Sequence, residues 1–177
     1  LVRSYELLKN NTELLAHYQS RFEHILVDEF QDTNTIQYKW IKLLSSGKNQ
    51  IFCVGDDDQS IYGWRGAKIE NIQKLESDFH PIQTIRLEQN YRSTGNILGA
   101  SNALIANNSN RLGKSLWTDS GDGDLIDVYE ARTETDEADY VVSTIQKYID
   151  DGVLPNECAI LYRSNAQSRS FEERQIG

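Results

Sequence analysis

Two adjacent carboxylates, Asp28 and Glu29, directly follow a short apolar run at residues 25–27. Buried strands of parallel sheets read as continuous apolar runs, and open α/β sheets bind ligands beyond the carboxyl ends of their strands. One carboxylate there could hold a hydrated Mg²⁺ ion, and its neighbour could orient or deprotonate an attacking water. The pattern suits metal-assisted phosphate chemistry. An ordinary helix start, with acids near the N-terminus of a segment beginning near Thr33, explains it equally well.

A second polar loop, residues 55–66, follows the next apolar run of the chain. Because this loop also follows a strand-like run, we expect it to lie beside Asp28 and Glu29 at the same sheet edge. Gln59 is a neutral side chain that can hydrogen-bond a phosphate oxygen without adding charge. The three acids at 56–58 could instead only cap the turn.

Tyr62, Trp64 and Arg65 lie in the same loop, in a stretch flanked by Gly63 and Gly66 that offers little helix or strand for packing. Aromatic rings beside an arginine suit stacking on unpaired bases, which is worth about 1–3 kcal/mol per base. The alternative is that Trp64 fills a hydrophobic gap between two layers of structure. The residues therefore indicate either a nucleic-acid contact or a packing element.

A third polar stretch follows another apolar run and precedes a helical pattern, for which Ser93 or Thr94 is a suitable N-cap. Arg92, just before the cap, could reach a neighbouring cleft and stabilise charge on a transferring phosphoryl group. Tyr91 could offer its face to a nucleobase. A surface ion pair between Arg92 and Glu88 is the simpler alternative.

Strand-like and helix-like apolar patterns alternate along the chain, which predicts parallel βαβ units and an α/β fold. Strands are expected at residues 25–27, 51–54, 84–87, 125–130 and 158–162. Helices are expected at residues 2–20, 34–46, 67–79, 95–107 and 135–150, with a last helix beginning near Asn165. The junction between two domains is expected near residues 87–91, where a strand leads into a polar cluster.

The chain has 177 residues, of which 25% are charged and 38% hydrophobic, as in one or two soluble globular domains. Its net charge of −9 argues at first against a nucleic-acid partner, but residues 119–139 alone carry −8. That segment is most simply a solvated acidic face, so a basic groove can exist elsewhere.

Cys53 and Cys158 lie in apolar runs, and two lone thiols favour a reducing, cytoplasmic compartment. No apolar run approaches the length of a membrane span, so no membrane partner is expected. The chain begins at Leu1 and stops within a helical pattern, so we expect it to be a piece of a longer protein.

Four segments, in the same order and spacing, together resemble the UvrD/PcrA/Rep family of superfamily 1 DNA helicases, and its UvrD members most. The segments read VDEFQDTN at residues 27–34, VGDDDQSIYGWRGA at 54–67, RLEQNYRST at 86–94 and AILYRSNAQSR at 159–169. They are distributed over nearly the whole chain. One such motif can match by chance, whereas four in register identify the family.

The resemblance implies an ATP-dependent motor that moves 3′ to 5′ on single-stranded DNA and unwinds duplex DNA in repair or replication. Asp28 would hold Mg²⁺ through its water shell, and Glu29 would be the general base on the hydrolytic water. Gln59 would couple the γ-phosphate to the DNA site. Arg92 would be an arginine finger from the second domain, and Tyr91 would stack on adenine. The implied DNA contacts are Tyr62, Trp64, Arg65, Arg163 and Asn165.

The same resemblance implies three-layer RecA-like parallel sheets and parts of two RecA-like domains. Residues 1–88 would be the C-terminal part of the first domain, and residues 89–177 the N-terminal part of the second. The sequence contains no Gly-x-x-x-x-Gly-Lys-Ser/Thr phosphate-binding loop, which in this family precedes the matched region. We therefore expect this chain alone neither to hydrolyse ATP nor to unwind DNA.

Other classes of protein remain as alternatives. A non-catalytic nucleic-acid-binding module, or a subunit of a helicase–nuclease, could share these motifs. The presence of Asp28, Glu29, Gln59 and Arg92 argues against a degenerate module. A DEAD-box RNA helicase does not fit the sequence Asp-Glu-Phe-Gln-Asp, and an α/β interaction domain without chemistry leaves the motifs unexplained. Repair proteins are possible partners beside DNA.

Overall fold

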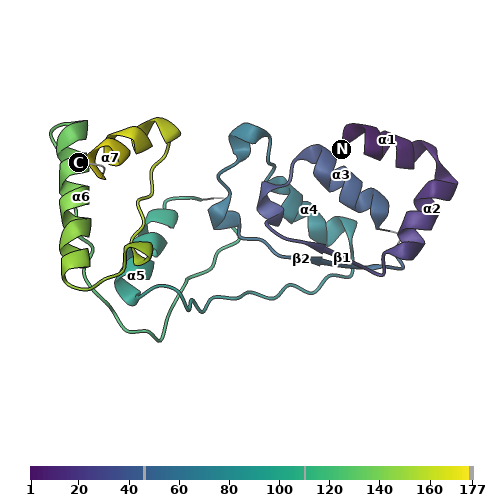
Figure 1. Cartoon of the computed structure of the whole chain (residues 1–177). Helices are drawn as coiled ribbons and strands as arrows, with labels where there is room; N and C mark the ends of the chain where they lie inside the picture. Colours follow the sequence, from purple (N-terminus) through teal and green to yellow (C-terminus); the bar gives the residue numbers. More distant parts are fainter. Residues whose placement is uncertain (46, 110, 176–177) are drawn as a thin grey trace. The chain divides into compact units, whose positions relative to one another are not determined.

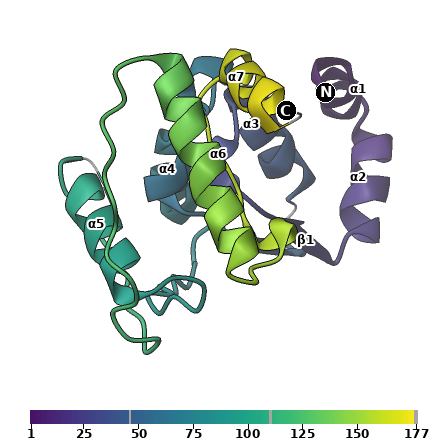
Figure 2. The same cartoon turned by 60° about the vertical axis from the view of Figure 1, so that its left-hand side comes forward.

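The computed structural model of the chain describes residues 1–45, 47–109 and 111–175 (Figure 1). It divides into two compact units, residues 1–124 and residues 125–177. Within the described residues, no helix combines the length and the apolar character that a membrane crossing requires. The first unit contains the sheet and most of the candidate site, and the second unit is built on two helices (Figures 1 and 2).

The N-terminal helical pattern forms two helices, α1 (Val2–Asn10) and α2 (Thr12–Arg21), so the prediction of one helix over 2–20 is wrong. The break falls at Asn11, whose backbone is extended (φ −129°, ψ 95°) and whose side chain accepts a hydrogen bond from Leu14 N at 2.9 Å. An asparagine that caps a following helix competes with continuation of the preceding one. Hydrophobic periodicity alone does not reveal that competition, so it predicted one continuous helix.

A βαβ unit forms the centre of the first unit, as predicted. Strands β1 (His24–Val27) and β2 (Gln50–Cys53) pair in parallel, and α3 (Thr35–Leu44) connects them. Helix α3 starts in a capping box, in which Asn34 Oδ1 accepts from Gln37 N at 3.0 Å and Gln37 Oε1 accepts from Asn34 N at 2.8 Å. The first turn of α3 has no acid, so Asp28 and Glu29 do not serve as its helix start.

Helices α3 and α4 (Glu70–Asp78) cover one face of the two strands (Figure 1). The core beneath them is Phe30, Tyr38, Ile41 and Leu75, with strand residues such as Val27, Ile51 and Cys53 packed against it. The alternate strand residues point away from this core, and Leu26 is 74% and Phe52 61% exposed. The strands are therefore half-buried rather than buried on both faces.

Three predicted strands, at residues 84–87, 125–130 and 158–162, are not formed, although all of these residues are described. Their apolar side chains are largely exposed, including Leu87, Leu125, Val128 and Leu161. Strand preference reflects packing against neighbouring strands more than a local backbone preference, so an apolar run without a partner stays irregular. The described residues thus form a mixed α/β structure with one two-stranded parallel sheet.

Helix α5 (Gly95–Ile105) belongs to the first unit and begins after Thr94, one of the two predicted caps. The Thr94 side chain makes no capping hydrogen bond. Instead, the backbone amides of Gly95 and Asn96 donate to the carbonyls of Gly121 and Asp122 at 2.8 and 2.9 Å. The helix start is therefore satisfied by a neighbouring loop, which no local cap signal could indicate.

The second unit pairs α6 (Glu134–Asp150) with α7 (Ser168–Gln175). Ser170 Oγ donates to Glu134 Oε1 at 2.6 Å, and an Arg174–Asp139 ion pair spans 3.2 Å between the same two helices. The acidic stretch around residue 130 is partly ordered by α6, because Tyr129 stacks on Tyr140 with ring centroids 3.8 Å apart.

Candidate functional site

The two carboxylates follow β1 on a sharply turned backbone. Glu29 adopts the left-handed conformation (φ 48°, ψ 46°), the one non-glycine residue of the described chain with positive φ. Its amide donates to Asp28 Oδ1 at 2.9 Å, and the next residue, Phe30, is 2% exposed and donates from its amide to Val54 O at 3.0 Å. A non-glycine residue holds such a conformation only where its surroundings impose it, and such residues cluster at functional sites.

Gln31 connects the end of β1 to the end of β2. Its Nε2 donates to Glu29 Oε2 at 2.7 Å, and its Oε1 accepts from the backbone amide of Asp56 at 3.0 Å. Gln31 is only 1% exposed, so both partly buried bonds start from a buried anchor. Gln31 therefore fixes the orientation of the Glu29 carboxylate relative to the loop after β2.

Gly55 permits the close approach of the two strand ends. A Cβ atom at this position would lie 2.9 Å from Gln31 Oε1 and 3.2 Å from Phe30 Cβ. The bond between Gln31 and Asp56 N depends on that space. The structure thus brings the Asp28–Glu29 pair and the Gln59 loop together at one sheet edge, as the sequence predicts.

The turn after Gly55 is organised by Asp56. Its Oδ1 accepts from Asp58 N at 3.0 Å, and its Oδ2 accepts from the Gln59 side-chain amide at 2.7 Å. The alternative role for the acids at 56–58, capping the turn, is therefore realised at Asp56, and the same cap holds Gln59.

The three acids also lie close enough to one another to suggest a metal site. Cationic side chains already pair with two of them, however, because Lys114 forms an ion pair with Asp56 and Arg111 with Asp58. Partial burial raises the pKa of Asp56, but hydrogen bonds from Lys114 and Gln59 outweigh this effect and leave the pKa below its ordinary value. The cluster is thus a structural turn in which two of the three carboxylates are paired with cations.

Asp28 has the donor chemistry expected of a magnesium ligand. Its side chain is exposed, Oδ1 is engaged by the Glu29 amide, and Oδ2 has no hydrogen-bond partner among the described residues. Carboxylate oxygen is the hard ligand that Mg²⁺ prefers, often through retained water. The residue therefore fits the implied water-mediated metal contact.

Tyr62, Trp64 and Arg65 form a cluster in which Trp64 and Arg65 are exposed and Tyr62 is half-buried. Trp64 is 76% exposed, which excludes the alternative that it fills a gap between layers. The Arg65 guanidinium lies 4.7 Å from the Tyr62 ring centroid and 4.5 Å from that of Trp64, and the two rings are 6.5 Å apart. This cation–π arrangement holds the Trp64 ring at the surface, beside the partly exposed Tyr62 ring, where a base could stack.

Tyr91 and Arg92 lie in an exposed turn before α5. Tyr91 is 79% exposed, and its hydroxyl donates to Gln89 Oε1 at 2.8 Å. No ion pair joins Arg92 to Glu88, both of which are described, so that alternative is wrong. Within the described chain, no hydrogen bond or ion pair joins the Arg92 side chain to Glu29 or to the Gln59 turn, so its role stays a prediction.

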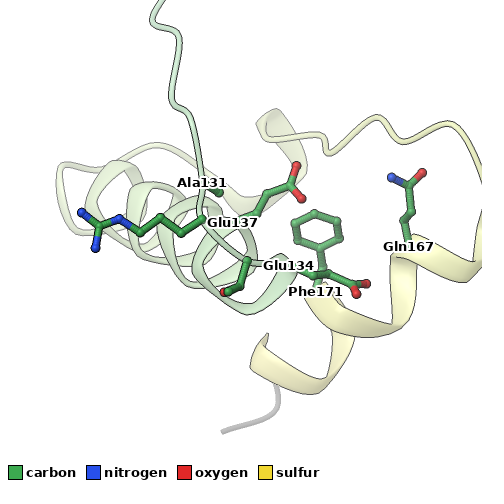
Figure 3. Close-up of a pocket in the computed structure, with 7 residues that line it drawn as sticks. Ala131, Glu134, Glu137, Gln167 and Phe171 are labelled. Carbon is green, nitrogen blue, oxygen red and sulfur yellow. The ribbon is translucent and has the colours of Figure 1, made fainter.

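Arg163 and Asn165 lie in the second unit, where both side chains are exposed. The Arg163 amide donates to Gln167 Oε1 at 3.1 Å, which orders the turn before α7. A pocket of about 500 Å³ lies nearby, and in Figure 3 the Phe171 ring lies between the Glu137 and Gln167 side chains. Neither Arg163 nor Asn165 lines that pocket.

Sequence reasoning missed the residues that hold the site together. Gln31 lies inside a quoted motif without a predicted role, Asp56 was expected at most to cap the turn, and Arg111 and Lys114 had no predicted role. Three consecutive acids were the available signal, because such a cluster within a folded turn needs cationic partners. Nothing local indicated which cations supply that charge.

Family comparison gives the class of protein to which this fold and site belong. Residues 1–80 match the UvrD/REP helicase N-terminal domain, and residues 85–175 match the UvrD-like helicase C-terminal domain. The chain therefore belongs to the UvrD-like helicase family, as the motifs predicted. Helicase domains of this family imply a RecA-like P-loop fold.

Curated relatives agree with this assignment. The chain is 61% identical to DNA helicase II of Escherichia coli over 98% of its length, and 60% identical to that of Haemophilus influenzae over 99%. It is 50% identical to the ATP-dependent DNA helicase PcrA of Staphylococcus aureus over 98%. The chain spans 24% of the length of each of these relatives.

Proposed function

We propose that this chain is part of an ATP-dependent DNA helicase that couples ATP hydrolysis to 3′–5′ movement on single-stranded DNA and to duplex unwinding. The observation that carries the proposal is the hydrogen-bonded path from Glu29 through Gln31 and Asp56 to Gln59, in the loop that also presents Trp64. Relatives named DNA helicase II and ATP-dependent DNA helicase PcrA support it.

Glu29 acts as the general base on the water that attacks the γ-phosphate. The bond from Gln31 orients its carboxylate, and ionised carboxylates are suited to accept a proton from a positioned water. Asp28 holds Mg²⁺ through water. When bound, Mg²⁺ neutralises charge on the phosphate oxygens. ATP and Mg²⁺ are thus the proposed substrate and cofactor.

Gln59 links the nucleotide to the DNA. Its amide is held by Asp56, and a phosphate oxygen could compete for that amide. Tyr62, Trp64 and Arg65 follow in the same loop, so a shift of Gln59 reaches the stacking side chains within a few residues. Each stacked base contributes about 1–3 kcal/mol, so making or breaking one stack would change the affinity of the loop for single-stranded DNA substantially.

We propose the remaining roles and the domain division on the same basis. Residues 1–88 and 89–177 belong to two RecA-like domains with three-layer parallel sheets. The family matches, which end at 80 and begin at 85, support a junction a few residues before position 88. Arg92 is the arginine finger of the second domain, and Tyr91 stacks on adenine. Arg163 and Asn165 are DNA contacts of that domain, for which exposure of both side chains is the support.

The partners that follow are single-stranded and duplex DNA, with repair proteins as possible further partners and the cytoplasm as the compartment. Cys53 and Cys158 are both free thiols, which supports a reducing environment.

A strand-displacement assay on the full-length protein tests this function. With ATP and Mg²⁺, a duplex with a 3′ single-stranded tail should be unwound and one with a 5′ tail should not. Glu29→Gln should bind the tailed DNA as the wild type does but leave it paired. A wild-type protein that binds the DNA and unwinds neither substrate would instead identify a non-catalytic binding module.

A further inference from the structure

A basic segment, residues 111–114, holds the acidic turn that carries Gln59. The Arg111 guanidinium forks onto one carboxylate, with Nε donating to Asp58 Oδ1 at 2.9 Å and Nη2 donating to Asp58 Oδ2 at 2.6 Å. The two side chains are 19% and 12% exposed. Bidentate arginine–carboxylate pairs combine charge with a fixed planar geometry, so this pair fixes position as well as neutralising charge.

The other two acids of the turn contact the same segment. Lys114 Nζ forms an ion pair with Asp56 Oδ1, and the Leu112 amide donates to Asp57 Oδ2 at 2.7 Å. Arg111 Nη2 also donates to the Lys114 carbonyl at 2.8 Å, so the guanidinium shapes its own segment while it binds the turn. All three acids are therefore engaged by three residues, Arg111, Leu112 and Lys114, of one four-residue segment.

Asp56 connects the candidate ATP site to the contacts that Arg111 and Lys114 make with the acidic turn, which we call the clasp. One of its oxygens receives Lys114 and the other receives the Gln59 amide, while its backbone amide is bound by Gln31. A change in the position of Asp56 would therefore disturb two hydrogen bonds together, the one from the Gln59 side-chain amide and the one to Gln31 Oε1. Removing Arg111 or Lys114 should thus affect the site, although within the described residues neither side chain hydrogen-bonds Glu29 or Gln59.

We propose that Arg111 and Lys114 are positioning residues that hold the 56–58 turn and thereby set Gln59 beside the Glu29 network. The proposal rests on the function proposed above, in which Gln59 couples nucleotide to DNA. Under the proposed division at 88/89, the clasp also joins a turn of the first domain to a segment of the second. Its loss should therefore act on coupling more than on ATP affinity.

The test uses the full-length protein and measures ATP turnover with and without single-stranded DNA. Arg111→Ala should lower the DNA-stimulated kcat about tenfold, the scale of one lost charged hydrogen-bond pair, with little change in KM for ATP. Arg111→Lys, which keeps the charge and loses the fork, should fall between Arg111→Ala and wild type. Exchanging the charges in the double variant Asp58→Arg, Arg111→Asp should recover part of the loss.

A double-mutant cycle separates positioning from general stability. If Arg111 acts through Gln59, combining Arg111→Ala with Gln59→Ala should lower turnover no further than Gln59→Ala alone. Additive losses would overturn the proposal. Arg21→Ala, an exposed arginine on α2, is the matched control and should leave turnover unchanged.

Two outcomes distinguish this proposal from the one on which it rests. If Glu29→Gln retains DNA-stimulated hydrolysis, the proposed function itself fails. If Glu29→Gln abolishes hydrolysis while Arg111→Ala and Arg111→Lys both match the wild type, only the clasp is wrong. If Arg111→Ala melts well below the wild type, Arg111→Lys and the charge-exchange variant test the proposal instead. The proposal is contradicted if Arg111→Lys is not intermediate in turnover and the charge exchange recovers none of the loss.

Discussion

The buried side-chain amide of Gln31 donates a 2.7 Å hydrogen bond to Oε2 of Glu29, two residues earlier in the chain. Glu29 itself sits on a left-handed backbone, so its carboxylate is fixed from both the main chain and a neighbouring side chain. Because Gln31 is in turn bonded to Asp56 N, the orientation of the Glu29 carboxylate depends on the loop after β2.

Removal of the Gln31 amide should slow hydrolysis without abolishing nucleotide binding. In the full-length protein, Gln31→Ala should lower kcat for ATP by about 10–100-fold, because a misoriented base loses most of its positioning advantage. Steady-state ATPase kinetics give kcat and KM separately. Gln19→Ala is the matched control, since Gln19 also donates one side-chain bond, from α2 to Leu43 O of α3 at 2.8 Å, away from the candidate site. Equal losses in the two variants would reduce Gln31 to a packing role.

Truncation of Trp64 should weaken single-stranded DNA binding and leave the fold intact. A lost stack corresponds to about 1–3 kcal/mol, or roughly 5- to 150-fold in Kd, and a side chain that is 76% exposed contributes little to the core. Fluorescence anisotropy of labelled oligonucleotide with full-length Trp64→Ala measures the effect. Tyr148→Ala removes an aromatic ring that is 51% exposed elsewhere and should bind as wild type. A lowered melting temperature with unchanged Kd would assign Trp64 to packing.

An acid-sensitive contribution to stability should reside at Asp78. Hydrogen bonds from Lys42 Nζ and Tyr38 OH, both 2.7 Å, lower the pKa of Asp78. A carboxylate whose folded-state pKa lies below the unfolded value of about 3.9 stabilises the fold above that pH, and the contribution is lost as the pH falls through the lowered pKa. Asp78→Asn should therefore reduce the melting temperature by about 2–4 °C at pH 7, and the deficit should shrink in acid.

Thermal unfolding followed by circular dichroism, from pH 7 down to about pH 2.5, checks this dependence. Glu76→Gln on the same helix α4 is the control, because it removes an exposed carboxylate and should show no pH-dependent deficit. A deficit for Asp78→Asn that stays constant over the range would mean that the carboxylate contributes by shape and not by charge.

The chain by itself should not hydrolyse ATP. It contains Asp28, Glu29 and Gln59 but no phosphate-binding loop, so the β- and γ-phosphates lack the backbone cradle that this chemistry uses. Release of phosphate from the purified 177-residue chain, with Mg²⁺ and single-stranded DNA, should equal the release in buffer. Turnover comparable to that of the full-length protein would contradict this expectation.

The elements that local signals specify agree closely with the sequence. Strands β1 and β2 and helices α3 to α6 appear within three residues of the predicted bounds, because apolar periodicity and nearby caps are local properties. The predicted strand at 84–87 is not formed, because a strand depends on partners that are not local in sequence. Its neighbours would be distant segments, and Ile85 and Leu87 remain 69% and 81% exposed where no strand pairs with them.

In the candidate site, too, some features follow from local sequence signals and others depend on distant residues. Proximity of Glu29 to the Gln59 loop follows from parallel strands ending at one edge, so the sequence was sufficient to predict it. The pair Arg111–Asp58 joins residues more than fifty positions apart, and no periodicity indicates it. Gln31 lies inside a recognised motif, but its two hydrogen bonds could not be predicted from the motif. They depend on the left-handed backbone at Glu29, which only the structure shows.

The measurement that tests the account most directly is DNA-stimulated ATP hydrolysis by full-length protein carrying Glu29→Gln. General-base catalysis contributes about 10²–10⁴-fold, so kcat should fall by at least about 100-fold while ATP still binds. Glu23→Gln, the same change at an exposed residue just before β1, should hydrolyse ATP as the wild type does. If Glu29→Gln and Glu23→Gln both turn over at the wild-type rate, Glu29 is not the base, and the assignment of an ATP site to this sheet edge is wrong.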